Sequence, residues 1–306
     1  MRAYILRRLI YSVFVLWGAA TIVFIAVRVV PGDPAVMIGG PDASKEQLAA
    51  IRQRLGLNQP LPIQYLRFLG QTARLDLGKS IRLEVPAIEE LGNRVPATAQ
   101  LAFCAMALAL LLSFPLGILA ALRYRSPFDS AVSVFSLVGQ AMPNFWLGIM
   151  FILLFARLLR LLPSGGIGTW QHLLLPAFTL SLPLVGVLTR LVRSGLLDVL
   201  SEDYVRTGHA KGLSARAVLT RHALPNMLIP VITVVGLQLG QLLGGTVIVE
   251  TVFSWPGVGR LVVEAITNRD YPLVQASILL ITSGFIVINF LFDLSYGYLD
   301  PRIRLR

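Results

Sequence analysis

Charged residues are scarce in this chain, and cysteine is nearly absent. Only 14% of the 306 residues are charged, whereas a soluble globular domain carries roughly 25%. The one cysteine, Cys104, lies inside an apolar stretch, so the sequence offers neither a disulfide framework nor a thiolate metal site. With 55% of its residues hydrophobic, the chain has the composition of a membrane protein.

The charges are missing from six long stretches, each about as long as a helix that crosses a bilayer. Such a helix needs about 20 residues to cover ~30 Å of hydrocarbon. A membrane β-barrel would show short alternating segments instead of solid apolar blocks. We therefore expect an all-α membrane protein with six transmembrane helices, formed from the runs Leu9–Val27, Val95–Leu122, Ser130–Ala156, Leu161–Thr189, His222–Val249 and Tyr271–Phe292.

Positive charge gathers on one side of these spans if the spans alternate in direction. The net charge is +11, and the short loops on the other side hold only Arg157, Arg160, Arg260 and Arg269. The positive-inside rule makes the basic side cytoplasmic, so both termini are expected in the cytoplasm. This distribution explains the basicity without a nucleic-acid partner. The basic side carries Arg2, Arg7, Arg8, Arg123, Arg125, Arg190, Arg193, Arg206, Lys211, Arg216, Arg221, Arg302, Arg304 and Arg306.

The spans divide the chain into three segments. Residues 1–30 are the first transmembrane helix, residues 31–94 a small extracytoplasmic helical insertion, and residues 95–306 a five-helix core with a cytoplasmic loop at 196–225. Within the insertion, Ser44 and Gln47 form a capping-box pattern, and Gly56 ends the helix that follows. A second amphipathic stretch starts near Pro62. We expect the insertion to lie on the membrane face, as a contact for a delivery protein or as a lid.

The sequence shows no catalytic, cofactor or metal site. The three histidines, His172, His209 and His222, have no cysteine or carboxylate at ligand spacing. Leu77–Ser80 reads LGKS, like the end of a phosphate-binding loop, but Ala73 stands where that motif requires glycine. We therefore expect no nucleotide site in this chain.

Uncharged polar residues inside the spans are candidates for a translocation pathway, because such groups usually face the interior of a helix bundle. The candidates are Gln140, Asn144, Gln238 and Gln241. Hydrogen bonding between helices is the alternative role. Pro143 beside Asn144 also predicts a kink in the third span.

The loop between the fourth and fifth spans predicts two short, separately capped helices. Ser201 can cap the first helix, whose first turn holds two acidic residues, and Gly212 can end it in a left-handed conformation. Ser214 can cap the second helix, after which Pro225 redirects the chain into the fifth span. An ordinary solvated loop would not need two caps.

This loop resembles the signature of the permeases of binding-protein-dependent ABC importers, which reads E-A-A, three residues, G, nine residues, I, one residue, L-P. Gly212 and Leu224-Pro225 fit that spacing, while Arg206–Gly208 and His222 depart from the general consensus. The departures resemble the peptide and nickel branch, close to DYVRTARAKGLS, with Gly208 and His209 replacing its alanine and arginine. Further matches to this branch lie at Pro31–Pro34, Leu55–Tyr65, Met142–Gly148, Phe253–Arg260, Arg269–Pro272 and Leu299–Arg304.

The resemblance implies a multi-pass subunit of the bacterial inner membrane that forms half of a pathway for dipeptides, oligopeptides or glutathione. It implies a second homologous permease, two cytosolic ATPases that bind ATP-Mg, and an extracytoplasmic binding protein, with lipid around the spans. The ATPases would be coupled through Glu202, Asp203, Tyr204, Val205, Arg206, Thr207, Gly208, His209, Ala210, Lys211, Gly212, Leu213 and Ser214.

Three other readings stay open. A nickel importer of the same branch is the main one, because the permease sequence says little about cargo. An ion-coupled secondary transporter would normally carry acidic residues in mid-span, and the six runs lack them. A membrane-embedded hydrolase would need a cluster of catalytic groups at one depth.

Overall fold

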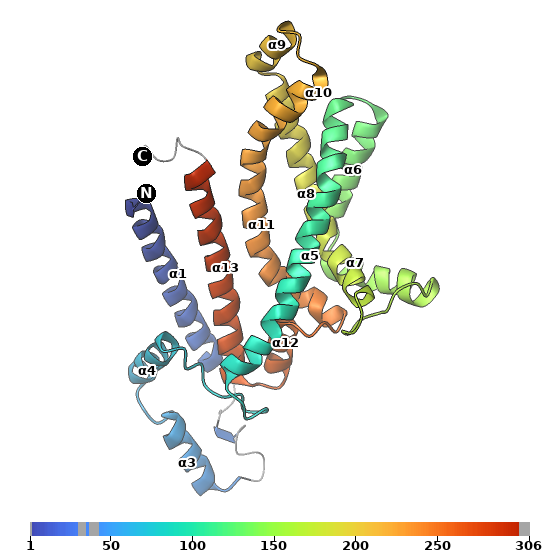
Figure 1. The fold of residues 1–306 in the computed structure, drawn as a ribbon. Coiled ribbons are helices and arrows are strands. Elements are labelled where there is room, and N and C mark those ends of the chain that lie inside the picture. Colours follow the sequence, from blue (N-terminus) through green and yellow to red (C-terminus); the bar gives the residue numbers. More distant parts are fainter. Residues whose placement is uncertain (1, 30–34, 37–42, 300–306) are drawn as a thin grey trace. The chain divides into compact units, whose positions relative to one another are not determined.

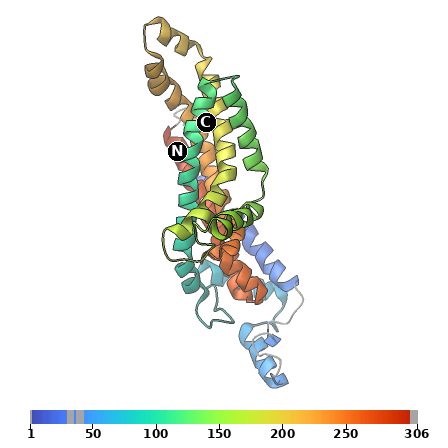
Figure 2. The same ribbon diagram turned by 90° about the vertical axis from the view of Figure 1, so that its right-hand side faces the viewer.

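A computed structural model describes residues 2–29, 35–36 and 43–299 of the chain (Figures 1 and 2). These residues form two compact units, which we describe separately. Of the described residues, 98–255 and 287–299 form one unit, and those within 2–97 and 256–286 form the other. The predicted motif at residues 31–34 and the basic residues 302, 304 and 306 lie outside the described residues. The orientation of the termini across the membrane stays a prediction.

The described residues are mainly helical, and five helices are long and apolar enough to cross a membrane. Between residues 43 and 299, an isolated β-bridge joins Lys79 and Pro86. Several spans extend beyond their uncharged runs, since α8 continues past Arg190 and α5 begins before Pro96. The five helices are α1 (Arg2–Val29), α5 (Ala87–Leu122), α8 (Gln171–Leu200), α11 (Leu224–Val252) and α13 (Tyr271–Leu299).

The third predicted span is broken rather than gently kinked. Helix α6 (Pro127–Ala141) is followed by α7 (Asn144–Phe151) and a π-helical segment η1 (Ile152–Leu158), and the chain bends by 103° between them. Pro143 has no N–H to continue the helix, and Met142 before it takes an extended conformation, with ψ 128°. The predicted kink is confirmed. The described helices give six spans only if the bent pair counts as one.

In the first unit, α8 packs closely against α6 and α5. A Cβ atom placed on Gly186 of α8 would lie 2.4 Å from the carbonyl oxygen of Ser136 in α6. One placed on Gly117 of α5 would lie 2.8 Å from the carbonyl oxygen of Thr189 in α8. Only a residue without a side chain allows backbones to approach so closely. Glycine at these two positions therefore sets how closely the helices pack.

An apolar cluster, here called the base cluster, joins the ends of α5 and α8 to the start of α11. Its members are at most 3% exposed, and they come from four helical segments, including the π-helical turn η2 (Leu219–Ala223). Because they lie in one packed group, neither α8 nor α11 can shift here without disturbing the other. The base cluster consists of Ala121, Val192, Leu196, Ala223, Met227 and Val231.

The second unit contains α1 and the insertion helices α3 (Lys45–Leu55) and α4 (Leu61–Ala73). It also contains α12 (Val258–Thr267) and the first part of α13. The predicted capping box is confirmed, because Ser44 accepts from the N–H of Gln47 while Gln47 accepts from the N–H of Ser44. Gly56 ends α3 with φ 69°, as expected.

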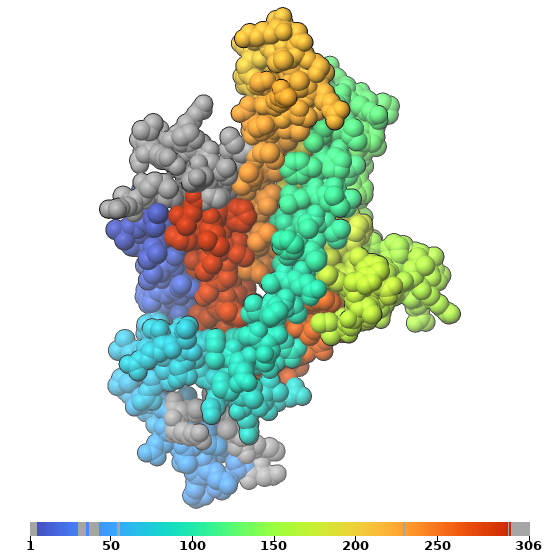
Figure 3. Space-filling model, viewed as in Figure 1, coloured from blue at the N-terminus to red at the C-terminus, as the bar shows by residue number. Residues whose placement is uncertain are grey.

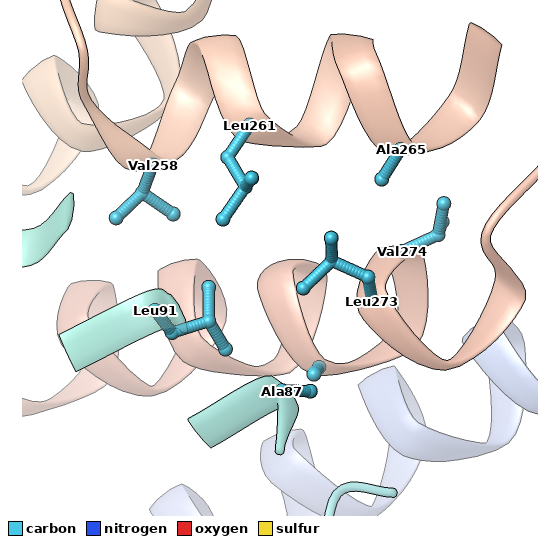
Figure 4. Close-up of a cluster of buried hydrophobic side chains, with 8 residues drawn as sticks. Ala87, Leu91, Val258, Leu261, Ala265, Leu273 and Val274 are labelled. Carbon is cyan, nitrogen blue, oxygen red and sulfur yellow. The ribbon is translucent and has the colours of Figure 1, made fainter. Parts of the chain in front are cut away.

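A second apolar cluster packs α12 on the starts of α5 and α13 (Figure 4). Beside it, the buried carboxylate of Asp270 accepts hydrogen bonds from the Ser80 hydroxyl and from the N–H groups of Arg82 and Leu273. Asp270 thereby caps the first turn of α13 and holds the loop before α5 against it. The cluster contains Ala87, Leu91, Val258, Leu261, Ala265, Leu273, Val274 and Ala276.

The close approach at Gly186 can be tested against a second helical glycine that has open space around it. Gly186→Ala should lower the thermal midpoint of the isolated chain in detergent, because the added methyl forces backbones apart at a cost of about 1–3 kcal/mol. Gly244→Ala should leave the midpoint unchanged or raise it, since a Cβ there meets nothing within 4 Å. Equal midpoints for the two variants would contradict the packing described for α6 and α8.

Candidate functional site

The first helix of the predicted hairpin is α9 (Asp203–Ala210). A cap at Ser201 would start this helix at Glu202, but it starts one residue later, at Asp203. The prediction that Ser201 caps it is wrong. Ser201 instead ends α8, where its hydroxyl donates to the carbonyl oxygen of Asp198 over 2.7 Å. Glu202 takes the extended conformation at the start of α9, without a side-chain cap. Because α8 runs on to Leu200, the groups of Ser201 are used at the end of that helix.

Gly212 closes α9 as the sequence predicts. Its φ is 82°, which is the left-handed conformation. The N–H of Gly212 donates to the carbonyl of His209 over 2.9 Å, and the N–H of Leu213 donates to that of Gly208 over 3.2 Å. This pair of bonds is the Schellman motif, which satisfies the last carbonyls of a helix. The turn therefore has a defined geometry rather than that of a flexible loop.

The second helix, α10 (Ala215–Val218), is capped by Ser214, whose hydroxyl accepts from the N–H of Ala217 over 3.3 Å. This cap was predicted. The expected redirection at Pro225 is wrong, because α10 continues through η2 into α11 without a turn. Pro225 lies in the first turn of α11, where a missing N–H costs little. The wide π-helical turn before it takes up the change in hydrogen bonding.

Apolar and polar contacts fix α9 to the helices that follow it. Val205 is 3% exposed and Val218 of α10 is 1% exposed. A Cβ on Gly208 would meet Val218 at 3.5 Å and Leu213 at 3.7 Å, so the same side of α9 packs on both. In addition, the amide of Asn226 in α11 donates to the Tyr204 hydroxyl over 3.1 Å. The hairpin is therefore joined directly to α11.

The remaining side of α9 and its cap is exposed, and it lies at the end of α8 and α11 remote from α7 (Figures 1 and 3). Asp203 and Arg206 form an ion pair of 3.6 Å on this surface, with 96% and 78% of their side chains exposed. Such a pair contributes little to stability, so these charges are free to meet another molecule. The exposed residues are Glu202, Asp203, Tyr204, Arg206, Thr207, His209, Ala210, Lys211, Gly212, Leu213 and Ser214.

The four pathway candidates lie in two places. Gln140 is exposed near the end of α6. Asn144 begins α7, and its side-chain amide oxygen is buried and, among the described residues, without a hydrogen-bond partner. Gln238 and Gln241 lie one turn apart on α11, half-buried and exposed respectively. Within the described part of the chain, neither glutamine forms a side-chain hydrogen bond. Their role in transport stays a prediction.

Two arginines that the sequence explained only by topology make specific contacts. Arg193 of α8 forms two hydrogen bonds with the buried carboxylate of Asp129, at the start of α6. Arg190 donates to Gln140, so this pathway candidate also joins α6 to α8. The guanidinium of Arg193 also lies 5.5 Å from the ring of Tyr124. The sequence does contain a signal for this contact, because the acidic Asp129 precedes the third span on the same side of the membrane as the arginines that follow the fourth.

These contacts place two sets of basic residues, those after α5 and those near the end of α8, at one end of the first unit. Arg193 meets Tyr124 and Asp129, so the loop holding Arg123 and Arg125 lies beside the last third of α8. At the other end of α11, a Cβ on Gly148 of α7 would lie 3.1 Å from Phe253. Arg157 and Arg160 follow α7 at that end. Within this unit, the predicted separation of the basic loops is therefore observed.

Comparison with known proteins places the chain in a family. The family described as "Binding-protein-dependent transport system inner membrane component" matches residues 113–305. The corresponding N-terminal family of transport-system membrane components matches residues 1–102. A chain of the MetNI methionine ABC transporter, in an inward-facing conformation, shares the fold, with a TM-score of 0.60 and 16% identity over 69% of this chain and 96% of that one.

Three relatives align with nearly the whole chain. The "Probable peptide ABC transporter permease protein y4tP" of Sinorhizobium fredii is 42% identical over 99% of this chain and 100% of its own length. A glutathione transport system permease of Salmonella paratyphi A is 42% identical over 99% of both chains. A dipeptide transport system permease of Alkalihalophilus pseudofirmus is 40% identical over 99% of this chain and 100% of its own length. The chain therefore belongs to the inner-membrane components of binding-protein-dependent transport systems, and it is a permease of the ABC importer type rather than an enzyme.

Proposed function

We propose that this permease imports small peptides, and that α9 with its Gly212 cap is the surface through which a cytosolic ATPase drives it. The cargo follows from the relatives named for peptide, glutathione and dipeptide transport, which are 40–42% identical over nearly the full chain. The coupling role follows from the hairpin. A short helix that is exposed on one side and packed on the other is suited to receiving force from a docked protein.

The proposed importer contains one further permease of the same fold, two ATPases and an extracytoplasmic binding protein. Members of this family work with ATPase subunits and a binding protein, and the numbers of each are part of the proposal. ATP-Mg binds to the ATPases, whose closure moves the docked α9. This chain contributes no covalent chemistry.

The observation that carries the coupling proposal is the rigid attachment of α9 to the spans. Gly208 lies against Val218 of α10, Tyr204 accepts a hydrogen bond from Asn226, and α10 continues through η2 into α11. The base cluster then joins α11 to α8. A displacement of α9 is thereby passed to two membrane-crossing helices. Such a connection is required if a protein outside the membrane is to shift the helix bundle between two conformations.

The four uncharged polar residues would line the passage that this movement opens. Gln140, Asn144, Gln238 and Gln241 offer amide groups without a net charge, which suits cargo that must be held weakly and released. Gln238 and Gln241 have the stronger case, because Gln140 is already hydrogen bonded to Arg190.

Nickel is the cargo that remains as an alternative within the same branch. Peptide and nickel can be separated by reconstituting the complete importer and measuring ATP-dependent uptake of labelled dipeptides and of nickel ions. We expect saturable dipeptide uptake, and nickel uptake no faster than that of vesicles lacking the permease. Nickel uptake alone would overturn the peptide assignment and leave the coupling proposal standing.

Gly212→Val tests the coupling surface. A β-branched residue at φ 82° is strained by about 1–3 kcal/mol, so the Schellman turn should open and ATP-dependent uptake should be lost while the chain still inserts. Gly166→Val is the matched control, because Gly166 has φ 85° and, like Gly212, open space around its Cβ position. It should keep most of the uptake. Equal losses in the two variants would assign the effect to general strain and refute coupling through α9.

A milder change tests whether α9 acts through its helical structure. Gly208→Ala adds a methyl at ordinary contact distance from Val218 and Leu213, and alanine favours helix over glycine by roughly 1 kcal/mol. Hydrogen exchange at residues 203–213 should slow and uptake should persist. Ala210→Gly should have the opposite effect on exchange. Faster exchange in Gly208→Ala would contradict the packing described for α9.

A further inference from the structure

Helix α4 has more apolar surface than the protein covers. No residue of α4 is buried. Gln64, Tyr65 and Phe68 face α1, whereas Ile63 and Leu66 remain 48% and 67% exposed. At 3.6 residues per turn, Leu66 lies about 140° around the helix from Gln71. The helix therefore has a polar side and an uncovered aliphatic side.

Three contacts fix α4 to the last two turns of α1. The hydroxyls of Thr21 and Tyr65 are hydrogen bonded over 2.7 Å. The ring of Phe24 lies 5.1 Å from that of Tyr65 and 5.5 Å from that of Phe68. The guanidinium of Arg28 donates to the side chain of Gln64 over 3.0 Å and lies 3.4 Å from the Phe24 ring centroid. The depth of α1 in the membrane thus sets the depth of α4.

That depth follows from the length of α1. Its uncharged run begins at Leu9, and about 20 residues cross ~30 Å of hydrocarbon, so the hydrocarbon ends near Arg28. Arg28 then lies at that boundary. Thr21, seven residues earlier at 1.5 Å per residue, lies roughly 10 Å inside it. Amphipathic helices on a membrane surface bury their apolar side to a similar depth, ~5–10 Å into the boundary between lipid headgroups and acyl chains.

The polar side of α4 is turned toward α3. The Arg67 guanidinium lies next to Gly56, since a Cβ there would be 2.4 Å from its Nη1 atom. Gly56 is the cap of α3, a helix rich in charged and amide side chains. Long cationic side chains commonly keep their charge at the membrane surface while their stems remain in apolar surroundings.

We propose that α4 is an interfacial helix whose aliphatic side, which carries Ile63 and Leu66, lies among the lipid acyl chains of the leaflet reached by the C-terminal end of α1. Lipid is the occupant because α4 is attached to a membrane-crossing helix at hydrocarbon depth. The insertion is thereby held against the membrane by α4, and α3 follows α4 on its polar side. This contact does not depend on the cargo or on the ATPases.

Site-directed spin labelling tests this proposal in the complete importer in lipid nanodiscs. In a Cys104→Ser background that retains uptake, nitroxides are placed by Leu66→Cys and, as the matched control, by Gln71→Cys, because both positions are exposed on α4. The label at position 66 should be relaxed by oxygen and shielded from a water-soluble nickel chelate. The label at position 71 should respond to the chelate.

Two results would overturn the proposal. Access of the chelate to position 66 in both the isolated permease and the complete importer would place the aliphatic side in water. Access in the isolated permease that is lost only when the binding protein and the other subunits are added would identify a protein as the occupant. Neither result bears on coupling through α9.

Discussion

The base cluster is the interaction on which the coupling half of the molecule depends. Ala121, Val192, Leu196, Met227 and their neighbours bring together the ends of α5 and α8 and the start of α11. Lipid supplies no hydrophobic force between helices, so close packing and polar contacts must hold them. Here glycine allows the close approach of α8 to α5 and α6, and the Asp129–Arg193 pair joins α6 to α8 beside the cluster.

Much of the fold follows from local sequence, because the signals are those of single helices. Uncharged runs predict five of the spans, and the Ser44 capping box predicts α3. The broken third span was harder, since Pro143 predicts a kink but not its size of 103°. That angle depends on how α7 packs on its neighbours, through Gly148 for example, and a local pattern does not contain this information.

In the candidate site, too, the features set by local sequence were predicted and those set by packing between helices were not. Gly212 and Ser214 were predicted correctly because a left-handed turn and a helix cap are set by one residue and its neighbours. Ser201 and Pro225 were misread because the ends of α8 and α11 depend on how far those helices stay packed beyond the membrane, here through Leu196 and Met227. The contact of Arg193 with Asp129 joins residues 64 positions apart. No local pattern specifies such a pairing.

The central claim is that α9 moves together with the spans it joins. Pulsed electron spin resonance between labels at Ala210→Cys in α9 and Ser194→Cys in α8, in a Cys104→Ser background, measures this directly. Both positions are exposed. In labelled importer that retains ATP-dependent uptake, we predict the same distance between the two labels in the nucleotide-free and ATP-trapped states. A distance that changes with nucleotide would show that α9 moves independently of α8 and would contradict the account.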